Sequence, residues 1–209
     1  MKEKYRERKV EIERRLKEFR EFLDKSDDSR LFAELAFCIC TPQSKATLCW
    51  ESIKALASSN LLFKGDVKQI IAQLIGVRFA RKKASYIVEA RNFFTKDSRL
   101  CIKEILISFR DPKELRNWLV NNIKGLGLKE SSHFIRNIGL SNNSLAILDR
   151  HILRCLKELG VIKDIPRSLS KKCYETIEIK MKEFAEEIEM PLDALDLLLW
   201  SEKTGFVFR

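Results

Sequence analysis

A stretch with two glycines near the middle of the chain, residues 121–137, constrains the fold more than any other part. Its sequence is NNIKGLGLKESSHFIRN. Apolar residues at helical spacing come before Gly125 and after Gly127, which predicts two helices joined by a tight turn. Because glycine adopts left-handed backbone angles at little cost, both glycines are expected to supply them.

The second helix of this predicted hairpin would carry Lys129 in its first turn. Unpaired backbone amides and the positive end of the helix dipole make such a helix start a site for phosphate. A lysine in that place is either an anion contact or a nucleophile. The local pattern leaves both interpretations open.

Composition narrows the class of protein. The chain has 209 residues, of which 45% are hydrophobic and 33% charged, as in a globular protein of one or two domains. It contains only seven glycines and four prolines, which favours long helices over a turn-rich β fold. A formal net charge of +10 suggests a polyanionic partner, most often nucleic acid.

Helical patterns cover most of the chain, and no segment predicts a strand convincingly, so the expected fold class is all-α. The predicted helices cover residues 3–24, 31–40, 45–58, 66–74, 98–109, 168–189 and 192–200, with further helices after residue 79, from 112 into the hairpin, from 128 to 139 and from 149. Ser44 is expected to cap the helix that starts at residue 45.

Two stretches before the hairpin are candidates for contacts with a ligand. Gln43 follows a proline at a helix junction, where an uncharged side chain can donate and accept hydrogen bonds. Residues 78–83 carry four positive charges, and Phe79 and Tyr86 are interleaved with them or follow them. Such a run suits phosphate contact with base stacking, or it is simply the cationic face of a helix.

Asp149 follows four apolar residues and starts a helix. In the structural interpretation Asp149 is a helix N-cap. In the functional interpretation it is a carboxylate held at the end of a buried segment and facing the hairpin helix. Both interpretations can be true at once. At the end of the chain, residues 201–209 are unusually apolar for a terminus, so the tail is expected to be docked, fixing Arg209 and the terminal carboxylate.

The six cysteines are scattered, with no CxxC pair, and are expected to be reduced and mostly buried. Only two of them follow the hairpin, which excludes a four-cysteine iron–sulfur cluster there. The chain has no apolar run long enough to span a bilayer and no apolar stretch typical of a signal peptide, so an intracellular protein is expected.

The hairpin with Lys129, followed by Ala-Ile-Leu-Asp149-Arg-His, resembles the helix–hairpin–helix superfamily of base-excision DNA glycosylases. The chain is most similar to the compact 8-oxoguanine DNA glycosylase/AP lyases of the second type, known chiefly from archaea and some thermophilic bacteria. Arg78-Phe79, residues 83–87 and Trp200, nine residues before the C-terminus, also match that group. The resemblance spans nearly the whole chain.

The resemblance implies a fold of two α-helical lobes with a cleft between them. One lobe would combine residues 1–40 with 150–209, and the other would cover 41–149 and contain the helix–hairpin–helix, 118–139. The target base would be flipped out of the duplex, since chemistry on a stacked base is sterically blocked.

The resemblance also implies a bifunctional mechanism. The amine of Lys129 would displace the damaged base at the deoxyribose C1′, form a Schiff base and cut the strand by β-elimination. Partial burial and a neighbouring positive charge would help Lys129 lose its proton. Asp149 would remain ionised and stabilise the oxocarbenium-like sugar. No redox or organic cofactor is implied.

Phosphate and base contacts follow from the same resemblance. The hairpin amides of Gly125 and Gly127, directly or through a bound monovalent cation, would hold a phosphate with His151, and no other metal is implied. Trp200 would stack on the flipped purine, and Phe79 is a candidate for its opposite face.

Two positions depart from the pattern of the group. Gln43 lies where relatives probe the gap left in the duplex, but its neighbours are Pro42 and Ser44 instead of an Ala-Asn-Ser sequence. Arg209 replaces the usual terminal lysine, which is involved in lesion recognition. Arginine keeps the charge but does not deprotonate, which argues against a base role for this side chain but not for the terminal carboxylate.

The expected partner is double-stranded DNA that contains an oxidised purine, bound by a monomer in the cytoplasm of a prokaryotic cell. One alternative is a related bifunctional glycosylase for another damaged base, in which only the pocket would differ. The other is a non-catalytic helix–hairpin–helix DNA-binding protein that uses the hairpin as a phosphate clamp. Covalent trapping on damaged DNA distinguishes these classes.

Overall fold

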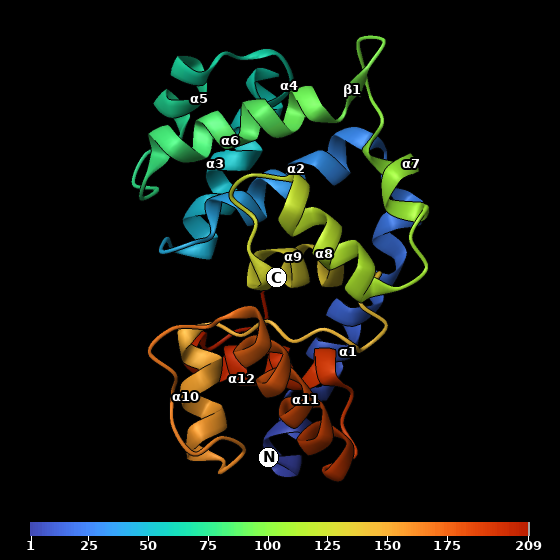
Figure 1. Ribbon diagram of the computed structural model, residues 1–209, viewed down its shortest axis with the longest axis vertical. Helices are drawn as coiled ribbons and strands as arrows, with labels where there is room; N and C mark the ends of the chain where they lie inside the picture. The colour runs from blue at the N-terminus through green and yellow to red at the C-terminus, as the bar shows by residue number, and fades with distance from the viewer. Residues whose placement is uncertain (209) are drawn as a thin grey trace. The chain divides into compact units, whose positions relative to one another are not determined.

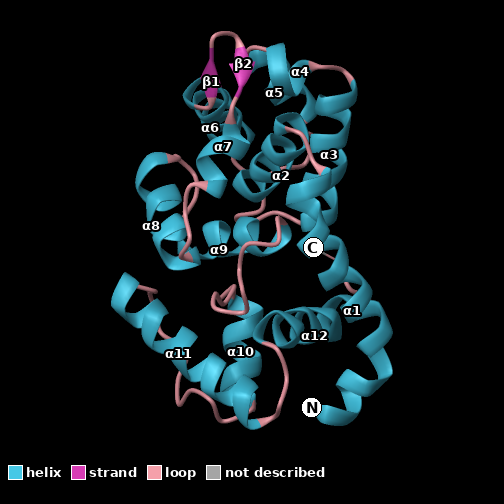
Figure 2. Ribbon diagram, turned by 90° about the vertical axis from the view of Figure 1, so that its right-hand side faces the viewer, coloured by secondary structure: helices cyan, strands magenta, loops and turns pink. Residues whose placement is uncertain are grey.

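The computed structural model describes residues 1–208, which form an almost wholly helical chain (Figures 1 and 2). The all-α prediction is confirmed. The described elements are α1 (Lys2–Lys25), α2 (Asp28–Cys40), α3 (Ala46–Ser58), α4 (Leu61–Lys64), α5 (Val67–Gln73), α6 (Ala80–Phe93), β1 (Thr95–Lys96), β2 (Arg99–Leu100), α7 (Ile102–Ile107), α8 (Pro112–Asn122), α9 (Leu128–Asn137), α10 (Arg150–Glu158), α11 (Lys171–Glu187) and α12 (Leu192–Thr204). None of these helices is long and apolar enough to cross a membrane.

The chain forms two compact units. The middle unit is Leu23–Phe134, and the terminal unit combines Met1–Phe22 with Ile135–Arg209. These boundaries differ from the expected ones, after residue 40 and at residue 149. Helix α2 packs against α3, α6 and α7, which places it in the middle unit. The segment that leads to Asp149 is hydrogen-bonded to α11, which places it in the terminal unit.

Helix α2 forms the centre of the middle unit. Its residues from Leu31 to Cys40 are almost entirely buried, because the helix carries apolar side chains on all of its sides. Asp27 caps its start by accepting a hydrogen bond from the Arg30 N–H at 2.8 Å. The neighbouring Asp28 accepts one from the Lys103 N–H at 2.7 Å, which ties α2 to the start of α7.

The cysteines nearest this core are free thiols. Cys38, Cys40 and Cys49 are buried, as expected from the sequence. The Cys49 thiol donates to the Cys40 carbonyl oxygen, with a donor–acceptor distance of 3.1 Å. Burial raises the pKa of Cys40 to about 12 and also raises that of Cys49.

The terminal unit is built around α12, whose residues 192–199 are all buried. The end of α9 is fastened to this unit by a buried ion pair between Arg136 and Asp196. Gly139 then ends the helical turn with φ of +82°, and a Cβ there would lie 2.4 Å from the Phe19 carbonyl oxygen. No other residue fits this close approach of two backbones without displacement.

Two local expectations were wrong. Strands β1 and β2 form a short antiparallel hairpin, and its turn residues Asp97 and Ser98 both have positive φ, as in a type I′ turn. Two-residue strands are too short to produce an alternating pattern, so the sequence did not show them. Ser44 does not cap α3, because Lys45 occupies the N-cap and makes no side-chain cap bond.

Candidate functional site

The glycine hairpin connects α8 to α9 over residues 123–127. Gly125 has φ of +90°, and a Cβ there would lie 2.6 Å from Cδ2 of Tyr86. The turn therefore needs glycine both for its angles and for its contact with the aromatic ring of α6. Gly127 does not have a positive φ, so the prediction that both glycines adopt left-handed angles was wrong for Gly127.

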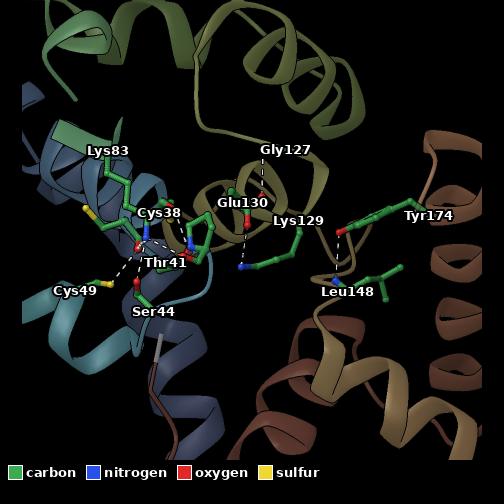
Figure 3. A network of polar contacts seen from close by, with 12 residues as sticks. Cys38, Thr41, Ser44, Cys49, Lys83, Gly127, Lys129, Glu130, Leu148 and Tyr174 are labelled. Atoms are coloured by element: carbon green, nitrogen blue, oxygen red, sulfur yellow. Dashed lines mark hydrogen bonds and ion pairs between the residues drawn. The ribbon is translucent and has the colours of Figure 1, made fainter. Parts of the chain in front are cut away.

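Glu130 occupies the start of α9. Its Oε2 accepts a hydrogen bond from the Gly127 N–H at 3.3 Å, and its Oε1 lies 3.0 Å from Nζ of Lys129 (Figure 3). The two side chains are 23% and 14% exposed, for lysine and glutamate respectively. An internal carboxylate thus occupies a hairpin amide expected to hold phosphate, and a DNA phosphate at that amide would have to replace it.

Lys83, on α6, is only 4% exposed and donates to three oxygen atoms. Its Nζ lies 2.6 Å from the Cys40 carbonyl oxygen, 2.7 Å from that of Pro42 and 3.0 Å from Oγ of Ser44 (Figure 3). Burial lowers the pKa of Lys83, and the positive charge of Lys129 lowers it further. Lys83 therefore lies close enough to Lys129 for their positive charges to interact.

The four basic residues of the run 78–83 differ in exposure, because only Lys83 is buried. Arg78, Arg81 and Lys82 are exposed, as a DNA-contacting face requires, whereas Lys83 points into the middle unit. Of the two interpretations open from the sequence, contact with DNA remains available to the first three side chains. For Lys83 the structure supports a role inside the protein.

Gln43 and Phe79 are both exposed and both in the left-handed backbone region. Their φ angles are +55° and +59°, and the Phe79 side chain is 53% exposed. The guanidinium of Arg78 lies over the Phe79 ring, 5.5 Å from its centroid. The Arg78 N–H donates to Oγ of Ser44 at 3.0 Å, so one hydroxyl group links the two turns.

Asp149 lies in the terminal unit and is the N-cap of α10. Its Oδ1 accepts a hydrogen bond from the Ile152 N–H at 2.7 Å. The preceding buried segment is held by α11: Glu178 accepts from the Ala146 N–H at 2.8 Å, and the Tyr174 hydroxyl donates to the Ala146 carbonyl at 2.7 Å. The capping interpretation of Asp149 is confirmed, and its position is fixed by backbone contacts.

His151 lies two residues further along, in the first turn of α10. Its Nε2 lies 2.8 Å from the Leu199 carbonyl oxygen and therefore carries the proton that is donated to it. A phosphate contact of this ring would therefore use Nδ1, and the expected role of His151 in phosphate binding remains a prediction.

Trp200, the residue after Leu199, is covered on one face by the tail. Its ring stacks on Phe208 at a centroid distance of 6.4 Å and an angle of 23°. The tail is docked as expected, since Val207 is buried and its N–H donates to Glu11 at 3.2 Å. Arg209 lies outside the described residues.

The candidate residues divide between the units. The middle unit brings together the Gln43 turn, Phe79, the hairpin and Lys129, and the terminal unit brings together Asp149, His151 and Trp200. Within residues 1–208, no cluster of three His, Cys, Asp or Glu side chains could hold a metal ion. The monovalent cation at the hairpin remains a prediction.

The sequence did not predict the contacts that Glu130, Lys83 and Ser44 make in the structure. Glu130 could have been found, because a glutamate three residues after a helix N-cap is half of a capping box. The roles of Lys83 and Ser44 depend on contacts between segments 34 to 43 residues apart, for which the sequence carries no local signal.

The chain is similar to known proteins over most of its length. The family model described as 8-oxoguanine DNA glycosylase matches residues 12–190. A protein of Fusobacterium nucleatum named 8-oxoguanine DNA glycosylase/AP lyase is 40% identical over 205 residues, covering 98% of this chain and 94% of the relative.

Solved structures give the same result for the fold. The Methanocaldococcus jannaschii 8-oxoguanine glycosylase/lyase, in complex with a 15mer DNA containing 8-oxoguanine, matches with a TM-score of 0.88 and 37% identity, over 99% of this chain and 98% of that one. The 8-oxoguanine DNA glycosylase of Thermotoga maritima matches with a TM-score of 0.86 and 33% identity, over 98% and 94% of the two chains.

Proposed function

Because the chain belongs to the 8-oxoguanine DNA glycosylase family, we propose that it excises 8-oxoguanine from duplex DNA and cleaves the abasic strand by β-elimination. The observation that carries this proposal is Lys129, held in the first turn of α9 beside the hairpin glycines. The relatives named above support both activities and the substrate, and one of them was solved with DNA containing 8-oxoguanine.

Lys129 acts as the nucleophile. Its neutral amine forms a bond to C1′ as the bond between C1′ and the base breaks, and the base leaves with a proton. The sugar ring then opens to a Schiff base. Loss of a C2′ proton breaks the C3′–O bond and cuts the strand, and water releases the enzyme by hydrolysing the Schiff base.

Asp149 supplies the negative charge for this chemistry. As the glycosidic bond breaks, positive charge develops on the sugar, and a fixed carboxylate stabilises that charge more than it stabilises the neutral substrate. The cap bond from Ile152 uses one carboxylate oxygen, Oδ1. Oδ2 is the oxygen that faces the substrate in this scheme.

DNA binding uses exposed groups of both units. Arg78, Arg81 and Lys82 contact phosphates, which makes affinity depend on salt. A phosphate replaces the Glu130 carboxylate at the Gly127 amide and so releases Lys129 from its ion pair. Trp200 exchanges Phe208 for the flipped purine. The protein acts as a monomer in the cytoplasm and needs no cofactor.

Borohydride trapping tests the proposal. The protein is incubated with duplex DNA bearing 8-oxoguanine, and borohydride reduces any Schiff base to a stable covalent adduct. We expect an adduct with the wild-type protein and none with Lys129→Gln. Lys54→Gln, an exposed lysine of the same unit paired with Glu51, is the matched control and should behave like the wild type.

The outcomes separate the competing functions. An equal adduct in Lys129→Gln would exclude Lys129 as the nucleophile. Trapping only on another damaged base would indicate a related glycosylase with a different pocket. Binding without any adduct on damaged or abasic DNA would indicate a non-catalytic helix–hairpin–helix protein.

A further inference from the structure

Lys83 is an unusual group to find buried in the middle unit. It is 4% exposed, and each of its three N–H donors has an acceptor within 3.0 Å. All three acceptors are uncharged: two backbone carbonyls and a hydroxyl. A buried charge without a carboxylate partner in hydrogen-bond contact is unfavourable for stability, so such groups cluster at functional sites.

The acceptors of Lys83 surround one short turn. The Cys40 carbonyl comes before the turn, the Pro42 carbonyl lies within it, and Ser44 ends it. Between the last two, Gln43 is held at φ of +55° with its side chain exposed. A left-handed angle at a residue other than glycine persists only where surrounding contacts fix it. Here the Ser44 N–H closes the turn by donating to the Thr41 carbonyl at 3.0 Å, and Lys83 binds the same turn from inside the unit.

Ser44 connects Lys83 to a second turn, the one that contains Arg78 and Phe79. Its Oγ accepts from Lys83 and also from the Arg78 N–H, both at 3.0 Å. The next residue, Phe79, is again left-handed, at φ of +59°, and exposed. Two strained turns, each presenting an exposed side chain, therefore share one buried cation and one hydroxyl group.

We propose that Lys83 is a positioning residue which, through Ser44, joins the Gln43 turn and the Phe79 turn into one rigid edge that holds duplex DNA open at the lesion. The inference rests on the proposed function, because it assigns that edge to the duplex substrate. Lys83 does not contact DNA in this scheme. It acts through the two turns that do.

The experiment compares a duplex substrate, which has to be held open by this edge, with a single-stranded substrate, which does not. Release of 8-oxoguanine from a duplex requires the damaged base to be extruded, whereas Schiff-base trapping on single-stranded abasic DNA does not. For Lys83→Met we expect single-turnover base release to fall about thirtyfold, because small displacements of positioning groups have effects of that size. Trapping on single-stranded abasic DNA should change by less than about threefold.

Ser44→Ala removes only the link and leaves the charge of Lys83. It should lower base release from the duplex by at least about fivefold and leave single-strand trapping unchanged, because it removes the hydrogen bonds from Lys83 and from the Arg78 N–H, each worth about 1 kcal/mol. Lys68→Met, an exposed lysine on α5, is the matched control and should equal the wild type. If Lys83→Met does not fold, the Ser44→Ala result decides the question by itself.

Two results would overturn the inference. A parallel loss on both substrates in Lys83→Met, with a shifted pH profile for trapping, would show that its charge acts on Lys129 directly. Full duplex activity in Ser44→Ala would show that the two turns are not joined through this hydroxyl. Neither result is confused with failure of the proposed function, in which the wild-type protein forms no adduct on either substrate.

Discussion

Lys129 and Asp149 each lie at the start of a helix, one in each unit, and the same helix dipole acts on them in opposite ways. Lys129 is the second residue of α9, where the positive end of the dipole is unfavourable for a cation. Asp149 is the N-cap of α10, where the dipole and the Ile152 amide favour an anion. The start of a helix thus stabilises the carboxylate of Asp149 and does not stabilise the ammonium of Lys129.

The two residues also differ in how they are held. The segment that leads to Asp149 is held by Tyr174 and Glu178 on α11, through the backbone of Ala146 and Leu148. The carboxylate itself accepts the cap bond from the Ile152 N–H. Lys129 is held through its own reactive atom, by an ion pair with Glu130. In the proposed mechanism the electrostatic group is thus in place in advance, whereas the nucleophile has to be released from its ion pair.

The largest effect is expected from Asp149→Asn. Asparagine caps a helix as well as aspartate does, so the fold should be unchanged. Loss of the negative charge should slow release of 8-oxoguanine about a hundredfold, the usual effect of removing one group that stabilises transition-state charge. Single-turnover base release measures it, and gel-shift titration should show nearly unchanged DNA binding.

Asp66→Asn is the matched control, since Asp66 caps α5 and accepts from the Gln69 N–H. It should retain full activity and stability. Unchanged turnover in Asp149→Asn would leave this residue only its role as a helix cap.

Trp200→Ala should have an intermediate effect. Stacking of a base on an aromatic ring contributes about 1–3 kcal/mol, so affinity for duplex bearing 8-oxoguanine should fall about tenfold. Affinity for undamaged duplex should stay the same, because its bases remain stacked in the helix. Fluorescence anisotropy with both duplexes measures the ratio, and an equal loss on both would place Trp200 outside the base pocket.

Glu130→Gln should have a smaller effect, and its direction is diagnostic. Removing the carboxylate that competes with phosphate should tighten binding to undamaged duplex about threefold at low salt, with a smaller difference at high salt. Titrations at two salt concentrations measure both. Weaker binding would show that Glu130 organises the hairpin and does not compete with DNA.

The smallest effect is expected for Lys83→Met, on the way the free energy of unfolding depends on pH. Burial lowers the pKa of Lys83 in the folded state from the ordinary value of 10.5, so in the window just below that value the unfolded chain binds more protons. Its contribution therefore makes the fold more stable as pH rises through this window. Lys83→Met should remove that contribution, as urea titrations at several alkaline pH values would show, and an unchanged pH dependence would contradict it.

The sequence predicted those features that depend on local signals. Gly125 and the apolar residues on either side of the hairpin give the two helices, and an aspartate after an apolar segment gives the cap at Asp149. The short α4 and the β1–β2 hairpin lack such signals, because they are too short to show a period. The boundaries of the two units also differ from the expected ones, since they depend on which neighbours α2 contacts and not on the residues of α2 itself.

The positions of Lys83 and Phe208 could not be predicted for a different reason. Lys83 follows two exposed basic residues, and nothing in that run distinguishes the side chain that turns inward. Its burial depends on acceptors 39 to 43 residues away. Phe208 covers Trp200 only because the tail folds back onto its unit. These contacts are properties of the tertiary structure.

The high pKa values of Cys40 and Cys49 have a consequence for the conditions under which this protein works. The oxidants that damage guanine also attack proteins, and they react with thiolates much faster than with thiols. Both of these thiols remain protonated at neutral pH, and Lys83 binds the carbonyl of one of them. Cys40 and Cys49 are therefore poor targets for peroxide, and we expect that their oxidation does not limit repair during the stress that creates the lesions.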